Sequence, residues 1–281
     1  MSLSGESEPH EPQAADDATR GPRRRGRKPS KQRPGKRRRV LVVVLSILGW
    51  ILCIWAIGLE AFSVPSASSY PTLVVGDHVF VNKWHYRWSE PARGELAVYE
   101  SPARPGVYIH RVLAIPGDEL LFHDGHPVIN GWEVPHCFLG MGKLSDADAA
   151  ALDAKKVQGD AFLEFLEGHA YLTFYDARIK SGDFLPDARY VVRAGEYFVI
   201  GDNRYNSYDS RMWFEGQSGG LPRNRFKGTV TFVWWGGEAG RFGTRADDAR
   251  LPSSLAPLAG AFDKCMKDRP AREKTVPPSP R

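Results

Sequence analysis

The chain has 281 residues and a formal net charge of +5, from 38 Lys and Arg against 33 Asp and Glu. Residues 1–39 hold 12 basic and 5 acidic residues, which leaves 26 basic and 28 acidic residues for the other 242. The length fits one anchor segment and one globular domain of roughly 200 residues. Because the positive charge lies in the first segment, no nucleic-acid binding is expected of the folded domain.

The N-terminal segment ends in a long apolar run. Residues 20–39 are rich in Arg, Lys, Pro and Gly, so residues 1–39 are predicted to form a disordered basic tail in the cytoplasm. Residues 40–59 carry no formal charge and are long enough to cross a hydrocarbon core of about 30 Å. One transmembrane helix is therefore predicted over residues 40–59, with the rest of the chain on the outer, periplasmic side of the cell (inner) membrane.

Two other interpretations of this segment stay open. A cleaved signal peptide competes with the anchor, although the run exceeds a usual signal-peptide core and lacks a small-x-small site near its end. A membrane-tethered nucleic-acid binder acting through the basic tail is the weaker alternative.

The three cysteines do not define a metal site. Cys53 lies in the apolar run, which leaves Cys137 and Cys265 in an oxidising compartment, and the sequence leaves open whether they pair. No Cys or His spacing is typical of a metal ligand set, so neither a metal nor another cofactor is expected.

The segment from Val64 to Asp77 follows the apolar run closely. It places three serines between two prolines in Pro65–Pro71, and each proline fixes its own φ and restrains the residue before it. A rigid turn with exposed hydroxyls at a membrane surface suits a nucleophilic serine. An ordinary Ser/Pro linker is the alternative interpretation.

The remaining chain is predicted to be mainly β, which favours a folded-over sheet or barrel. A short helix is expected from Leu144 to Lys155, with Ser145 as its N-cap. Residues 201–211 form a polar loop, and the tail from Asp263 is expected to fray. Apolar runs predict strands over residues 78–83, 96–99, 107–115, 120–122, 128–129, 171–175, 190–193, 197–200 and 229–235.

A nucleophilic serine needs a base, and His110 in the strand 107–115 is the candidate. The alternative is a partly buried sheet histidine bonded to the backbone. Asp202, Ser207 and Asp209 in the polar loop are candidates to orient the base. Their alternative role is to hold the loop through turn bonds and Asp–Arg pairs.

Three segments carry a resemblance to a known family. Residues 65–73 read Pro-Ser-Ala-Ser-Ser-Tyr-Pro-Thr-Leu, with Gly-Asp at 76–77. Residues 110–118 read His-Arg-Val-Leu-Ala-Ile-Pro-Gly-Asp, and residues 201–211 read Gly-Asp-Asn-Arg-Tyr-Asn-Ser-Tyr-Asp-Ser-Arg. In content and in order they resemble the nucleophile, base and last boxes of type I signal peptidases, the leader peptidase family of serine proteases. The resemblance covers about residues 40 to 236.

The resemblance implies a role for each matching position. Ser68 corresponds to the nucleophile, and Ser66 to the serine whose hydroxyl joins the Ser68 N–H in the oxyanion hole. Ser207 corresponds to the serine that hydrogen-bonds the base, and Asp209 with Arg211 to a structural pair near the site.

The resemblance also implies a signal-peptidase-like fold: a folded β-sheet or barrel catalytic core with an inserted β-rich second domain, preceded by one transmembrane helix. The catalytic core is then expected at residues 60–118 and 196–262, the inserted domain at residues 119–195 and the C-terminal tail at residues 263–281.

This sequence departs from the family's bacterial pattern at three positions. His110 stands where most bacterial members have the lysine base, as in the endoplasmic-reticulum and archaeal-type relatives, and no lysine occurs between residues 83 and 143. Ser69 replaces the usual Met after the nucleophile, and Tyr205 replaces an Asp of the last box. Ser69 and Tyr70 are expected in the substrate pocket.

The leading hypothesis is a membrane-bound serine endopeptidase that removes signal peptides from translocated preproteins. Asp209 or Asp202 is expected to orient the shorter His110 side chain, and the rate is expected to rise near pH 6 to 7, around the unperturbed imidazole pKa. The alternative is a substrate-restricted or inactive paralogue that binds or processes one dedicated precursor.

Overall fold

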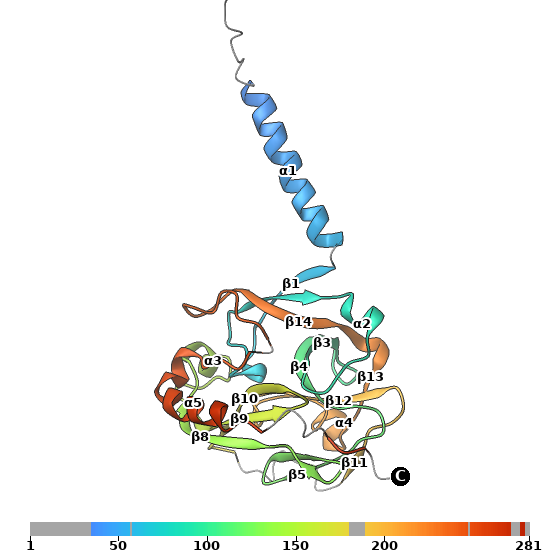
Figure 1. The fold of residues 1–281 in the computed structure, drawn as a ribbon, viewed down its shortest axis with the longest axis vertical. Helices are drawn as coiled ribbons and strands as arrows, with labels where there is room; N and C mark the ends of the chain where they lie inside the picture. Colours follow the sequence, from blue (N-terminus) through green and yellow to red (C-terminus); the bar gives the residue numbers. More distant parts are fainter. Residues whose placement is uncertain (1–34, 57, 180–188, 247, 271–275, 279–281) are drawn as a thin grey trace, which may run out of the picture. The chain divides into compact units, whose positions relative to one another are not determined.

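The computed structural model describes residues 35–56, 58–179, 189–246, 248–270 and 276–278 (Figure 1). The chain divides into two units, one ending at Ile47 and the other beginning at Leu48. All the described strands lie in the second unit. Most of the predicted basic tail, residues 1–34, lies outside the described residues.

Helix α1 runs from Lys36 to Ala56 and includes the last four basic residues of the predicted tail. Within the described part of the chain, none of the helices combines the length and the apolarity that a membrane crossing requires. The predicted transmembrane helix over residues 40–59 is therefore not supported. The apolar run does not stay helical throughout, because Gly58 adopts a φ of 74° and strand β1 begins at Leu59.

A seven-stranded antiparallel sheet forms the centre of the second unit and confirms the mainly β prediction. Strand β3 alternates between its two faces, so that Leu96 and Val98 enter one apolar cluster while Ala97 and Tyr99 enter another. Both faces of the sheet are therefore buried here. In spatial order the strands are β1 (Leu59–Ser63), β2 (His78–Asn82), β14 (Phe226–Trp235), β3 (Leu96–Glu100), β4 (Val107–Ala114), β12 (Glu196–Ile200) and β13 (Leu221–Pro222).

Two smaller sheets are built largely from residues 119–195, the segment predicted to be an inserted domain. One orders β10 (His169–Asp176), β9 (Gln158–Leu166) and β8 (His136–Lys143). The other orders β11 (Tyr190–Val191), β5 (Glu119–His123), β6 (His126–Ile129) and β7 (Trp132–Glu133). In Figure 1, β14 crosses one end of the unit and β5 lies at the other.

The three-stranded sheet shares its core with the serine-containing turn. Tyr70 and Val74 of the turn lie in one buried cluster with Leu163 of β9 and Phe174 of β10. This packing couples the position of the turn to residues that are about 90 to 100 places away in the sequence.

The other helices are short and lie around the sheets: α2 (His85–Trp88), α3 (Asp146–Ala150), α4 (Trp213–Gly216) and α5 (Ala259–Lys267). The predicted helix at residues 144–155 is present as the shorter α3, and the N-cap prediction is confirmed because Ser145 Oγ accepts the Asp148 N–H at 3.1 Å. The expectation that the chain frays from Asp263 is wrong for the residues that α5 contains.

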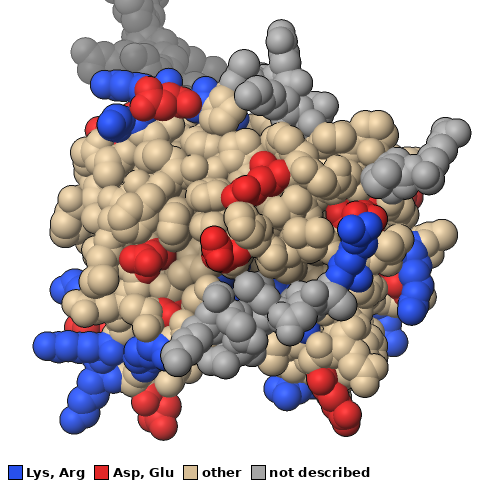
Figure 2. Space-filling view, turned by 90° about the horizontal axis from the view of Figure 1, so that it is seen from below, with Lys and Arg blue, Asp and Glu red and all other residues tan. Residues whose placement is uncertain are grey.

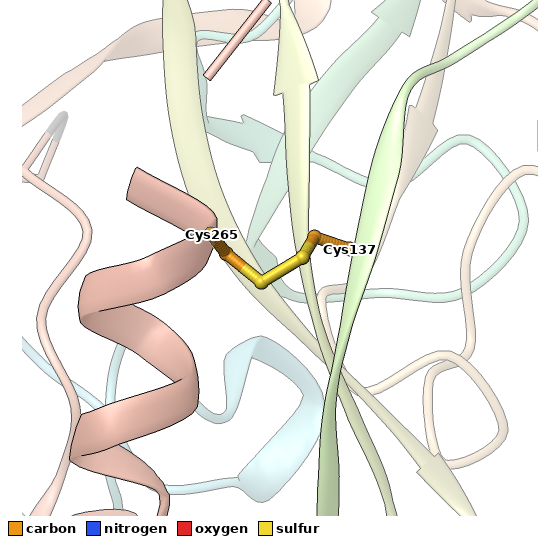
Figure 3. The surroundings of a disulfide bond; sticks show 2 residues. All are labelled: Cys137 and Cys265. Carbon is orange, nitrogen blue, oxygen red and sulfur yellow. A yellow bond between two sulfur atoms is a disulfide. The ribbon is translucent and has the colours of Figure 1, made fainter. Parts of the chain in front are cut away.

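A disulfide explains why the C-terminal helix is held. Figure 3 shows Cys137 of β8 bonded to Cys265 of α5, with Cα atoms 6.0 Å apart and a sequence separation of 128. Cys265 is also buried in the apolar cluster to which side chains of the three-stranded sheet belong. The bond therefore fastens α5 to β8.

Charged side chains are dispersed on one face of the folded unit. On the face seen in Figure 2, Lys and Arg side chains lie around the margin, and Asp and Glu side chains lie between them. The described residues form no continuous basic patch on this face, of the kind that phosphate backbones need.

Replacing Cys265 tests the contribution of the disulfide. Cys265→Ser is expected to lower the free energy of unfolding by about 2–4 kcal/mol, because the bond closes a long loop in the unfolded chain. Denaturant unfolding under oxidising conditions measures this loss. The control is Cys53→Ser, which removes an exposed free thiol and should change the value by less than about 0.5 kcal/mol. Equal stabilities of the two variants would contradict the prediction.

Candidate active site

The turn predicted to hold the nucleophile is a closed loop between β1 and β2. Its ends are joined by the Val64 N–H donating to Asp77 O at 2.8 Å and the Gly76 N–H donating to Val64 O at 3.0 Å. The Asp77 carboxylate accepts the Val74 N–H at 3.0 Å and the Arg241 Nε–H at 2.9 Å. Backbone and side-chain bonds therefore fix the shape of the loop before any substrate binds.

The serines of this turn differ in exposure. Ser66 is exposed and Ser68 is partly exposed, and their Oγ atoms lie 3.3 Å apart. Ser68 lies within a short 3-10 helix that spans Ala67–Ser69. Two hydroxyls and the start of a helical turn therefore meet at the surface.

Ser69 and Tyr70 are not arranged as a substrate pocket would require. Ser69 is 1% exposed and donates to Ile109 O at 2.6 Å. Tyr70 is 0% exposed, with its hydroxyl 2.9 Å from Lys143 O and 2.8 Å from Ser254 Oγ. This differs from the sequence-based expectation, because the folded chain already uses both side chains to fasten the turn.

The polar loop at residues 201–211 packs directly against the turn. Asn203 donates its backbone N–H to Ser68 O at 3.1 Å and its side-chain N–H to Ala67 O at 3.0 Å. A Cβ atom on Gly201 would lie 2.5 Å from Ser68 O and 2.2 Å from Ser207 Oγ. The absence of a side chain at Gly201 therefore allows Ser207 and the backbone of Ser68 to approach each other.

His110 reaches the same place from β4. It is 1% exposed, with Nε2 3.2 Å from Ser207 Oγ and Nδ1 2.7 Å from the Tyr99 hydroxyl. Among the described residues, no hydrogen bond joins His110 to Ser68. The structure thus brings His110, Ser207 and the Ser68 backbone together through the loop at Gly201.

Burial dominates the protonation of His110. Removal from water disfavours the charged ring and lowers its pKa from 6.5 to about 4, with the charge of Arg211 acting in the same direction. The charges of Asp209 and Asp202 act in the opposite direction without cancelling the burial effect. At neutral pH the ring is therefore neutral and able to accept a proton.

Neither candidate aspartate hydrogen-bonds His110, so the expectation that one of them orients the ring directly is wrong. Asp209 binds Arg211 through both oxygens, at 2.8 and 2.7 Å, and accepts the Gly201 N–H at 2.9 Å. Asp202 binds Arg111 through both oxygens, at 2.9 and 2.6 Å. Each carboxylate is instead engaged by the planar fork of an arginine.

Both ion pairs are buried, and in each pair the partner's charge outweighs the effect of burial on the pKa of one member, Asp209 or Arg111. Burial alone would raise the pKa of Asp209, but the charge and hydrogen bonds of Arg211 lower it below its usual value. Burial likewise opposes the charge on Arg111, and Asp202 outweighs it and raises its pKa. Asp209 and Arg111 therefore remain charged across the neutral range.

Tyr99 is the residue in contact with His110 that the sequence reasoning missed. In the register of β3 and β4, His110 lies opposite Ala97, so Tyr99 is its diagonal neighbour on the same face. Both strands were predicted, but their register was not. On a paired strand, the residue two positions beyond the partner of His110 lies on the same face as His110. An aromatic residue at that position is the signal that would have pointed to Tyr99.

No group of three or more His, Cys, Asp or Glu side chains arranged to hold a metal ion occurs among the described residues. The reactive groups gathered here are the Ser66 and Ser68 hydroxyls, the neutral His110 ring, and the Ser207 and Tyr99 hydroxyls. This set suits acyl transfer through a serine.

Comparison with known proteins agrees with this chemistry. A family model described as "Signal peptidase, peptidase S26" matches residues 37–235. The chain belongs to this family. It is a serine endopeptidase of the signal peptidase I type, which confirms the resemblance seen in the three sequence boxes.

Individual members of the family are similar to this chain over most of their own length. Signal peptidase I of Aquifex aeolicus is 30% identical over 225 residues, which cover 72% of this chain and 85% of the relative. Signal peptidase I of Pseudomonas fluorescens is 32% identical over 214 residues, covering 69% of each chain. A crystal structure of a signal peptidase I from Enterococcus faecalis V583 matches at 22% identity with a TM-score of 0.28, covering 51% of this chain and 98% of that one.

Replacing Asp202 tests the buried ion pair beside the site. Asp202→Asn leaves the Arg111 guanidinium buried without a counter-charge, and a loss of about 3–5 kcal/mol in the free energy of unfolding is expected. The control is Glu60→Gln, which breaks the exposed ion pair with Lys83 and should cost no more than about 1 kcal/mol. Denaturant unfolding of both variants gives the comparison, and similar losses would contradict the prediction.

Proposed function

We propose that this signal peptidase removes N-terminal signal peptides from translocated preproteins, with Ser68 as nucleophile and His110 as general base. The observation that carries the proposal is the meeting of three segments at Gly201. There the Ser68 backbone and the Ser207 hydroxyl approach each other, and Ser207 lies 3.2 Å from His110 Nε2.

The proposed reaction follows the two steps of serine proteases. Ser68 Oγ attacks the carbonyl carbon of the scissile bond while its proton passes to Nε2 of His110, and the ring then gives that proton to the departing amine. In the second step, water attacks the acyl-enzyme, His110 takes a proton from the water, and Ser68 leaves with it. Ser207 holds Nε2 toward the turn between these events.

The negative charge of the tetrahedral intermediate needs donors near Ser68. The Ser66 hydroxyl, 3.3 Å from Ser68 Oγ, and the Ser68 backbone N–H are the proposed pair. One such donor is worth about 3–4 kcal/mol of the barrier in serine proteases. Asp202, Asp209 and Arg211 are proposed to support the site by holding the loop rather than by contacting the substrate.

The substrate class and the place of action are proposed from the family. The relatives that are named signal peptidase I support preprotein signal peptides as substrates. The proposed location is the cell membrane, with a cytoplasmic N-terminus and the catalytic unit outside. The family and the concentration of basic residues in residues 1–39 support this location. No observation favours the alternative of an inactive or single-substrate paralogue.

Two substitutions test the catalytic assignment. Ser68→Ala and His110→Ala are each expected to lower kcat for a preprotein by at least about 10³-fold, because each removes one half of the nucleophile–base unit. Cleavage of a panel of preproteins in detergent, followed by electrophoresis, measures the rates. Ser89→Ala is the control, since its exposed hydroxyl bonds only to His85 O among the described residues.

The outcomes separate the proposals. Undiminished cleavage by either variant would remove that residue from the mechanism. Cleavage of one precursor alone by the wild-type protein would restore the single-substrate alternative, and cleavage of none would restore the inactive one.

The pH dependence follows from the buried base. His110 accepts a proton only when neutral, so kcat/KM should rise as the pH rises through about 4 and be level between pH 6 and 7. This corrects the sequence-based expectation of a rise near pH 6 to 7, which assumed a solvated ring. Initial rates from pH 3.5 to 8, with the fold monitored by circular dichroism at each pH, provide the test. A half-maximal rate between pH 6 and 7 would contradict it.

A further inference from the structure

Among the described residues, the hydroxyl of Tyr99 is the closest hydrogen-bond partner of the His110 ring. It lies 2.7 Å from Nδ1, whereas Ser207 Oγ lies 3.2 Å from Nε2. Tyr99 is 0% exposed, and its hydroxyl hydrogen-bonds to His110. Each side chain therefore satisfies the hydrogen bonding of the other in a buried position.

The numbers of hydrogen-bond donors and acceptors on the His110 ring change during the proposed reaction. A neutral imidazole has one N–H donor and one acceptor nitrogen, whereas the charged ring has two N–H donors. A hydroxyl can donate to a bare nitrogen or accept from an N–H by rotating its proton. Tyr99 can therefore stay bonded to Nδ1 in every protonation state of the ring, which a carboxylate could not do for a bare Nδ1.

We propose that Tyr99 is the positioning residue of His110 and takes the place of the carboxylate that orients the base in serine proteases. The inference rests on the proposed role of His110. When Nε2 takes the proton of Ser68, the Tyr99 oxygen accepts the Nδ1–H, and no proton moves to or from the phenol. The charged ring then has an acceptor at each nitrogen, Tyr99 at Nδ1 and Ser207 at Nε2.

The surroundings of Tyr99 hold the phenol in this one place. Its ring packs edge-on against Trp213 with centroids 6.0 Å apart, stacks on Tyr108 at 6.1 Å and lies 6.5 Å from Phe226. All of these neighbours are aromatic, so a phenylalanine fits the same space without its hydroxyl. The substitution Tyr99→Phe thus removes one oxygen and preserves the packing.

The experiment compares Tyr99→Phe with wild type and a matched control in the full-length protein. The control is Tyr197→Phe, because Tyr197 belongs to the same apolar cluster and its hydroxyl makes a bond of the same 2.7 Å length, but to Glu90. For Tyr99→Phe, kcat for a preprotein should fall about tenfold, the value of one lost buried hydrogen bond, while KM stays within about twofold. Tyr197→Phe should leave both constants within about twofold.

A second measurement reports the state of the two His110 ring nitrogens directly. The 15N shifts of labelled histidine rings, with the His110 signal assigned by its loss in His110→Gln, report whether each ring nitrogen is bare or protonated. In Tyr99→Phe the His110 Nδ1 signal should move, and in Tyr197→Phe it should not. This readout does not depend on catalysis.

The two measurements separate the possible failures. An unmoved Nδ1 signal, or a kcat within twofold of wild type in a folded Tyr99→Phe variant, would overturn the role of Tyr99. If His110→Gln retained full activity while the Nδ1 signal still moved in Tyr99→Phe, the assignment of His110 as base would fail and the contact itself would stand.

Discussion

The buried ion pair between Arg111 and Asp202 is the interaction on which the geometry of the site depends. It joins β4 to the polar loop, with the two side chains 1% and 0% exposed. Thr72 of the serine-containing turn donates to the same carboxylate at 2.5 Å. Because Arg111 follows His110 on a strand, the two side chains point to opposite faces. Fixing the arginine therefore fixes the depth at which the histidine enters the site.

Other buried pairs of a carboxylate with an arginine surround the site and determine its electrostatics. Asp77 pairs with Arg241, Glu164 with Arg204 and Asp209 with Arg211, and all of these carboxylates are fully buried. Burying such pairs is costly unless every charge is matched, and here the carboxylates are held by guanidinium groups. They leave His110 no carboxylate to bond, so burial outweighs the aspartate charges and lowers the pKa of the ring.

Sequence reasoning succeeded where the information was local and failed where it depended on distant contacts. The apolar run of residues 107–115 predicted β4, and the position of Ser145 before an acidic first turn predicted the N-cap of α3. The contact between Tyr99 and His110 depends on the register of two strands, which neither strand encodes alone. The pairing of Cys137 with Cys265 and the order of α5 depend on packing across 128 residues. The burial of Tyr70 similarly depends on Phe174, far along the chain.

A base held by hydroxyls rather than by a carboxylate changes the balance between the two halves of the proposed reaction. A ring with a pKa near 4 is a weak acceptor for the Ser68 proton, which makes the attack harder. Once charged, however, the same ring is a strong acid and readily protonates the departing amine. The proposed oxyanion donors must then supply more of the lowering of the barrier to attack. They stabilise the negative charge that forms on the substrate, to which the weak base contributes little. In the proposed reaction the Ser66 hydroxyl, 3.3 Å from Ser68 Oγ, therefore contributes more than it would beside a stronger base.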